Sequence, residues 1–173
     1  MPNTFTLIAS STVGAGGAAS IDFTSIPSTY TDLCLEFSVR SNYASTFDAS
    51  LLRINGDTGS NYSSRYIRGD GSSVSSSSST AGTSIFVGSI PGANATASTF
   101  QNAAIYFPNY AGSTNKSLSV DSVSENNATT AYALLSAGLW SSSAAITSLK
   151  LILDAGTLYL QHSTAYLYGI VKS

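Results

Sequence analysis

The feature that most constrains the fold is an alternation of apolar and polar residues near the end of the chain. Within residues 145–153, leucine occupies every second position of the last five, and Lys150 falls between two of them. A helix would not align these leucines, because its period is 3.6 residues, so the segment is predicted to be a half-buried strand. The alternation returns in residues 157–162 and in residues 166–170. The sequence therefore predicts a meander of three consecutive strands at the C-terminus.

Turn residues separate the predicted strands. Asp154-Ala155-Gly156 follows the first C-terminal strand, and Gly156 is expected to supply the positive φ of a tight turn. Asn55-Gly56 is a second turn signal, because both residue types tolerate a positive φ. The turns cut the chain into short segments.

The same alternation recurs between turn residues along most of the chain. It covers residues 4–9, 21–23, 31–40, 48–54, 85–87, 99–107, 116–124 and 130–140. The last of these also tolerates a helix, but its pattern favours a strand. Many short strands without a firm helix predict an all-β protein, an antiparallel jelly-roll β-sandwich of about eight strands. An immunoglobulin-like sandwich is the alternative, although a single Cys34 and a single Trp140 lend it no Cys-Trp-Cys pattern.

The length of 173 residues fits one domain. Residues 1–20 are predicted to be an N-terminal strand and a flexible arm of small residues that contacts a neighbouring protein. Residues 21–173 are predicted to be a single β-sandwich domain. Within it, residues 56–82 are expected to be a long loop, because the serine-rich stretch 72–80 has one apolar residue and no core of its own. This loop is expected to be exposed or to lie at the axis of an oligomer.

Charge is scarce in this sequence. Charged residues are 9% of the chain, against about 25% in ordinary soluble domains, and the net charge is −2. The seven basic residues form no cluster, so binding to nucleic acid through phosphate contacts is not expected. No stretch is long enough to span a membrane, and the N-terminus lacks a secretion signal, so the protein is expected to be made in a cytoplasm. A weakly charged surface does not resist association, and we expect copies of the chain to cover its sheet edges.

Catalytic and metal sites find little support in the sequence. His162 is the only histidine, and no Gly-x-Ser-x-Gly nucleophile turn accompanies it. We therefore expect no enzyme, no catalytic residue and no cofactor, and one histidine argues against zinc. Loop carboxylates leave open a bound Ca²⁺, which takes several oxygen ligands. These carboxylates are Asp48, Asp57, Asp70, Asp121 and Glu125. Cys34 lies in an alternating run and is expected to be a small core residue.

Aromatic residues suggest one binding hypothesis. Ten tyrosines and Trp140 could stack on sugar rings, and the candidates for such stacking are Trp140, Tyr62 and Tyr66. Tyrosines in strands also pack well for structural reasons, and that interpretation is favoured for most of them.

Two stretches of the chain resemble a group of small virion proteins of tailed bacteriophages. They are residues 52–63 (LRINGDTGSNYS) and residues 166–170 (YLYGI). A Phe-Thr-Ser-Ile-Pro turn at residues 23–27, followed by Tyr-Thr-Asp-Leu at residues 30–33, fits the same group. These segments follow the expected order along nearly the whole chain.

The resemblance implies a jelly-roll sandwich used as a capsid decoration (cement) protein, a head fibre or a tail appendage. It also implies a symmetric oligomer, so the predicted partners are the chain itself, as a homotrimer, and the major capsid protein or another virion protein. The predicted location is the exterior of the phage particle. The first expectation is a non-enzymatic cement protein that stabilises a phage head. The alternative is a host-attachment module of a tail or head fibre that binds surface carbohydrate.

Overall fold

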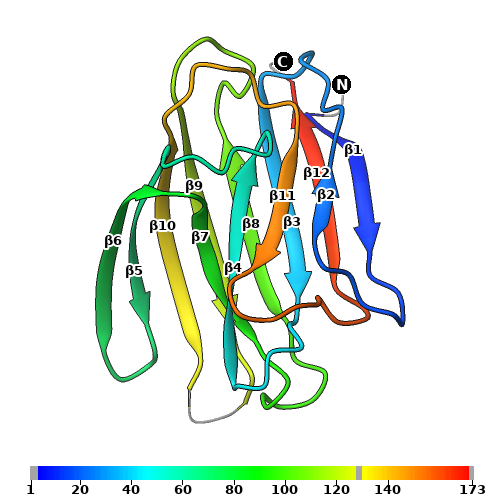
Figure 1. Cartoon of the computed structure of the whole chain (residues 1–173), viewed down its shortest axis with the longest axis vertical. Helices are drawn as coiled ribbons and strands as arrows, with labels where there is room; N and C mark the ends of the chain where they lie inside the picture. Colours follow the sequence, from blue (N-terminus) through cyan, green and yellow to red (C-terminus); the bar gives the residue numbers. More distant parts are fainter. Residues whose placement is uncertain (1–3, 128–129, 172–173) are drawn as a thin grey trace.

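The computed structural model of the chain describes residues 4–127 and 130–171. Every element in this part is a β-strand (Figure 1). The strands are β1 (Phe5–Thr12), β2 (Ile21–Phe23), β3 (Asp32–Val39), β4 (Phe47–Ile54), β5 (Tyr62–Gly69), β6 (Val74–Gly82), β7 (Ile85–Pro91), β8 (Gln101–Phe107), β9 (Lys116–Ser124), β10 (Tyr132–Trp140), β11 (Leu149–Leu153) and β12 (Thr164–Ile170). In these residues no helix has the length and apolar character needed to cross a membrane.

The strands form two sheets of unequal size, packed face to face. The large sheet has the order β1-β12-β3-β8-β9-β10-β5-β6, and the small sheet has the order β2-β11-β4-β7. All neighbouring strands within each sheet run antiparallel. The predicted all-β, antiparallel sandwich is confirmed, with twelve strands rather than about eight.

The core lies between the two sheets and follows the predicted alternation. On β3, Leu33, Leu35, Phe37 and Val39 are buried, and they face the small sheet. Strand β9 alternates between buried and exposed side chains along its whole length. Segment 130–140, which tolerated a helix on local grounds, is strand β10 because β9 and β5 pair with it on both sides.

The predicted C-terminal meander is wrong. Strands β11 and β12 belong to different sheets, and the residues between them cross from one sheet to the other. Residues 157–162 contain no regular strand; Tyr159 alone forms isolated bridges with Ala18 and Ser41. Tyr159 is fully buried while its leucine neighbours are half-buried, so the alternation is real, but it does not reveal which sheet a segment joins.

The two predicted turns have different physical causes. Asn55 and Gly56 both have a positive φ, of 53° and 67°, as this turn dipeptide predicts. Gly156 does not have a positive φ. A Cβ at Gly156 would lie 2.3 Å from the Ser41 hydroxyl oxygen and 2.6 Å from a carboxylate oxygen of Asp48. The close approach of Asp48 therefore requires glycine at this position.

The N-terminal segment does not form the predicted arm. Strand β1 pairs with β12 at one edge of the large sheet. Beyond it, the Val13 amide donates to the Ser163 carbonyl at 2.8 Å, and Ala18 exchanges backbone hydrogen bonds with Tyr159. The predicted strand within residues 1–20 is confirmed, while the arm is replaced by chain that is bonded to the sandwich. Residues 1–3 lie outside the described part.

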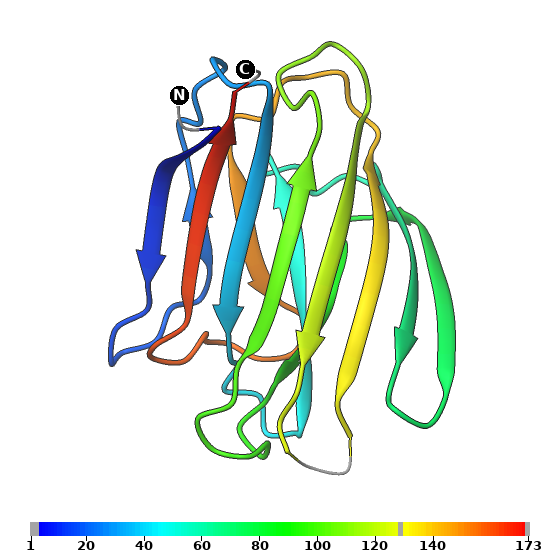
Figure 2. The same ribbon diagram turned by 180° about the vertical axis from the view of Figure 1, so that it is seen from behind.

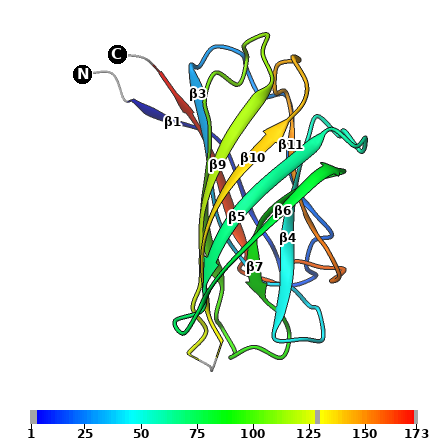
Figure 3. The ribbon, with the colours of Figure 1, turned by 90° about the vertical axis from the view of Figure 1, so that its left-hand side faces the viewer.

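The predicted loop at residues 56–82 also needs correction. Most of it is a hairpin of β5 and β6, which lies at the far edge of the large sheet from β1 (Figure 1). In its turn the Asp70 carboxylate accepts hydrogen bonds from the Ser72 and Ser73 amides, at 2.9 and 2.7 Å. Pairing with β5 satisfies backbone groups whatever the side chains are, so the scarcity of apolar residues in β6 was no evidence against a strand. Figure 3 shows this hairpin crossing in front of the sandwich, next to β10.

Candidate functional site

Two of the three predicted sugar-stacking residues are not available to a ligand. Trp140 and Tyr62 are 3% and 1% exposed. The Tyr62 hydroxyl accepts from the Ile54 amide at 3.0 Å and lies 3.1 Å from the Asp57 carbonyl. Both rings are therefore part of the core. The sequence did not distinguish them from surface aromatics, because strand alternation places an aromatic residue on a face without saying what covers that face.

Trp140 also anchors the connection between β4 and β5. Its indole N–H donates to a carboxylate oxygen of Asp57 at 2.7 Å, and that carboxylate accepts further bonds from the Asn61 amide group and the Gly59 N–H. These donors, with Trp140 the strongest influence, hold the pKa of Asp57 below its usual range. This cluster links the start of the β5–β6 hairpin to β10.

Tyr66 is the third predicted stacking residue, and it is half-buried. Its ring packs against Phe86 of β7, with ring centroids 5.0 Å apart and an angle of 48° between the rings. The structure therefore does not bring Trp140, Tyr62 and Tyr66 together as one exposed platform. Tyr66 holds the hairpin against the edge of the small sheet.

The surface that is open for binding is the outer face of the large sheet. No element of the described chain lies over it, as Figure 2 shows from the side of that sheet. Nine large hydrophobic side chains are exposed in the described residues, and strand register places eight of them on this outer face. The eight are Phe5, Leu7, Ile67, Val74, Tyr106, Val123, Leu135 and Tyr166. Such a concentration on one face is typical of a protein contact surface.

The eight residues form two groups, one on each half of the face. The aromatic patch consists of Phe5, Leu7, Tyr166 and Tyr106 on β1, β12 and β8, and the aliphatic patch consists of Ile67, Val74, Val123 and Leu135 on β5, β6, β9 and β10. Two carboxylates, Glu36 and Asp121, lie between the patches and flank Ala104 in the strand register. The face therefore carries two apolar patches, with these two carboxylates between Tyr166 and Leu135.

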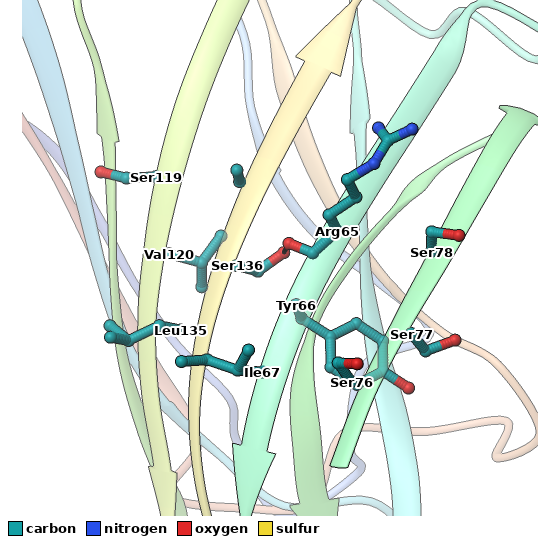
Figure 4. Close-up of a pocket in the computed structure, with 11 residues that line it drawn as sticks. Arg65, Tyr66, Ile67, Ser76, Ser77, Ser78, Ser119, Val120, Leu135 and Ser136 are labelled. Carbon is teal, nitrogen blue, oxygen red and sulfur yellow. Dashed lines mark hydrogen bonds between the residues drawn. The ribbon is translucent and has the colours of Figure 1, made fainter. Parts of the chain in front are cut away.

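A shallow hollow of about 660 Å³ lies beside the aliphatic patch (Figure 4). Leu135 and Ile67 are directly opposite each other in the β10–β5 register and form its apolar wall. Ser76, Ser78 and Arg65 border it with hydroxyl groups and one positive charge. Ile67 and Leu135 are more than half exposed, at 54% and 56%, so an occupant of the hollow would remove substantial apolar surface from water.

A second hollow, of about 800 Å³, lies at the loop end of the sandwich near Arg40 and His162. Two of its polar side chains, Arg40 and Asn42, are engaged within the chain. The Arg40 guanidinium donates to the carbonyls of Thr96 and Ala95, at 2.6 and 3.0 Å, and burial lowers its pKa. The Asn42 carbonyl oxygen accepts from the Thr157 amide at 2.9 Å. These contacts organise the loops at this end.

The carboxylates considered for Ca²⁺ lie in different parts of the sandwich. Asp48 accepts from Ser41 and from the amides of residues 155 and 156, while Asp57 binds Trp140. Asp70 caps the β5–β6 turn. In residues 4–127 and 130–171, no three His, Cys, Asp or Glu side chains gather as a metal site requires.

Cys34 occupies an unexpected face of its strand. Its neighbours Leu33 and Leu35 point into the core, so Cys34 points to the outer face, yet it is only 9% exposed. In the strand register it lies between Tyr168 and Tyr106. Burial, with a smaller effect of Glu36, raises the pKa of the Cys34 thiol to about 11. The predicted burial is confirmed, although it is provided by neighbours on the outer face.

One signal in the sequence could have found the outer face. In β10 both alternating sets contain leucine, since Leu134 is buried and Leu135 is exposed. A strand that is apolar on both sides needs a partner on both sides, and only one side meets the small sheet.

No family model, curated protein or solved structure matches this chain. The resemblance to tailed-phage virion proteins therefore remains a prediction.

Proposed function

We propose that this chain is a non-enzymatic virion structural protein, a decoration (cement) protein on the exterior of a tailed-phage head. The observation that carries the proposal is the concentration of exposed hydrophobic side chains on the uncovered face of the large sheet. A cement protein stabilises a shell by adding contact area across subunit junctions. A broad, weakly charged face with two apolar patches suits that role.

The order of the strands supports the jelly-roll interpretation. Strands β1 and β12 pair, as do β2 and β11, β3 and β8, and β4 and β7. In a jelly roll, strands pair in this nested order and divide between two four-stranded layers. The β5–β6 and β9–β10 hairpins are then insertions that widen one layer. The widening supplies the strands that carry the aliphatic patch.

The assembly part of the proposal is a homotrimer bound to the major capsid protein or another virion protein. Attachment of three linked copies raises the effective affinity of each single contact, so each copy needs only a moderate interface. The outer face carries few charges, so its attachment should weaken little when salt is added. The chain would be made in the host cytoplasm and added to assembled heads.

Host attachment through carbohydrate is the second candidate. The sequence predicted Trp140, Tyr62 and Tyr66 as the residues that stack on sugar rings. Trp140 and Tyr62 are buried, so they are not available for stacking. The aromatic patch is the aromatic surface that remains exposed. In this candidate function, a carbohydrate would therefore stack on the side chains of the aromatic patch.

Immunogold labelling of intact particles with an antibody against this protein tests the proposal. Gold over the head is the expected result. Gold at the tail would favour host attachment, and particles without gold, from infected cells rich in the protein, would contradict an exposed virion role.

A binding experiment tests whether the exposed hydrophobic side chains of the outer face make the attachment to the head. Purified protein is added to heads that lack it, and the double variant Ile67→Glu/Leu135→Glu is compared with Tyr43→Glu. Of the exposed large hydrophobic residues in the described part of the chain, Tyr43 is the one that lies outside the outer face, so it serves as the matched control. The double variant should lose binding by tenfold or more, while Tyr43→Glu should retain it. Equal binding of all three proteins would contradict attachment through this face.

A further inference from the structure

The edge strand β6 presents a second surface, besides the outer face, that is open to another protein. Strand β6 ends the large sheet, and its side chains from Val74 to Ala81 are all exposed. It contains no charged residue and no proline. Proteins commonly protect such edges with lysine, proline, bulges or very short strands, because unpaired backbone groups attract another strand.

The hydrogen-bond pattern identifies which residues of β6 present these backbone groups. The Asp70 amide donates to the Ser73 carbonyl at 3.2 Å in the hairpin turn. Bonded and non-bonded pairs alternate in an antiparallel ladder, so the register makes Ser75 and Ser77 the residues bonded to β5. Ser76 and Ser78 therefore direct their N–H and C=O groups away from the sheet.

The other three sheet edges carry protective features. Strand β2 has three residues, and β7 contains Gly88, whose φ is 139°, and ends at Pro91. Strand β1 shifts register between Leu7 and Ala9. In β6 the register is regular from Val74 to Ser79, and the irregularity comes only after that stretch. Among these edges, β6 has the longest uninterrupted stretch of regular register.

We propose that the free edge of β6 pairs, antiparallel, with the β6 edge of a second copy of this chain. A twofold axis near Ser76 would place the two serine runs opposite each other and join two large sheets into one continuous sheet. The segment from Ser75 to Ser79 is all serine, so twofold pairing brings together identical small, uncharged side chains without clash or like-charge repulsion. A second copy is therefore a matched partner for this edge.

The same pairing has a consequence for the outer face. In a continuous antiparallel sheet the outer faces of both copies lie on the same side. Val74, which is 79% exposed, would then lie opposite Ser78 of the second copy, and the two aliphatic patches would face the same side of the joined sheet, on either side of the paired serine strands. This pairing does not depend on the virion role, because it follows from the edge alone.

The pairing should be weak in dilute solution. A contact made by one short edge buries less than the roughly 1,200–2,000 Å² of a stable interface. Association is therefore expected at high protein concentration, with a dissociation constant on the order of 0.1–1 mM, and more strongly where copies are held close together.

Sedimentation velocity of the full chain over a concentration series up to about 1 mM tests the proposal. The parent protein should shift reversibly towards a dimer. Ser76→Lys adds an edge charge and Ser76→Pro removes an outward N–H, and either should weaken association at least tenfold. Ser117→Lys is the matched control, because Ser117 is an exposed serine on the same sheet face but on the interior strand β9. Association that is absent up to 1 mM, or equal in all four proteins, would overturn the proposal.

Cysteine cross-linking supplies an independent measurement. In a Cys34→Ser background, Ser76→Cys and Ser78→Cys are compared with Ser117→Cys under mild oxidation. Opposed residues of an antiparallel pair have Cα atoms about 4.5–5.5 Å apart, within the range for a disulfide. A disulfide-linked dimer is expected from at least one β6 variant and not from Ser117→Cys. Dimers from Ser117→Cys alone would place the contact elsewhere and contradict the proposal.

Discussion

The β9–β10 and β5–β6 hairpins extend the same sheet, yet they contribute unequally to the core, because β6 contributes nothing to it. Strand β7 of the small sheet packs against β9 and β10, and the inward side chains of both strands are buried. Beyond β5 the small sheet has no further strand, so β6 is exposed on both faces. The difference shows that a strand can be specified by backbone pairing alone, whereas its stability depends on what lies across from it.

The largest expected effect that tests this comparison is in amide hydrogen exchange. Backbone amides of β6 should exchange about a thousandfold faster than those of β9, because β6 can open without exposing the core. Exchange monitored by mass spectrometry on peptides covering residues 74–82 and 116–124 makes the comparison. Equal protection of the two peptides would mean that the β5–β6 hairpin opens only when the whole sandwich unfolds.

The next effect separates the two faces of one strand. Leu134→Ala creates a cavity in the core and should lower the free energy of unfolding by about 2–5 kcal/mol. Leu135→Ala, at the neighbouring position on the outer face, should change it by less than about 0.5 kcal/mol. Urea denaturation of both variants measures these values. A large loss of stability in Leu135→Ala would show that the outer face is covered in the free protein.

A smaller, pH-dependent effect concerns the attachment of the β5–β6 hairpin to β10. Hydrogen bonds from Trp140, Asn61 and Gly59 lower the pKa of Asp57 in the folded protein. The carboxylate therefore adds stability above its unfolded pKa of about 3.9, and this stability is lost as the pH falls through the lower folded value. Asp57→Asn should lower the Tm at pH 7, and its difference from the parent should shrink towards pH 3.

Thermal unfolding at several pH values measures this difference. Asp121→Asn, a change to an exposed carboxylate on the outer face, is the control for a general effect of charge. If Asp57→Asn and Asp121→Asn change the Tm equally at every pH, the hydrogen bonds of Asp57 contribute nothing specific.

The smallest expected effect concerns a covered part of the outer face. The raised pKa of Cys34, about 11, and its burial should leave the thiol unreactive at pH 8. Labelling with a thiol reagent should be slow in the native protein and complete after unfolding. Rapid labelling of the native protein would mean that the neighbouring side chains on the outer face do not cover Cys34.

Much of the fold could be predicted from local pattern. Leucine alternation in residues 149–153 and the Asn55-Gly56 turn gave the correct local structure. The serine-rich strand β6 was missed because its partner β5, rather than its own side chains, specifies it. The proposed stacking residues Trp140 and Tyr62 were misplaced because their burial comes from segments far away in the sequence.

The sequence by itself determined that this chain is built of short strands, since a two-residue period admits no helix. It also determined the weakly charged surface, which follows from composition alone. Only the tertiary structure decided that β11 and β12 lie in different sheets and that one sheet extends past the other. Alternation defines two faces for every strand, but a face is buried or open according to which distant strands pack against it.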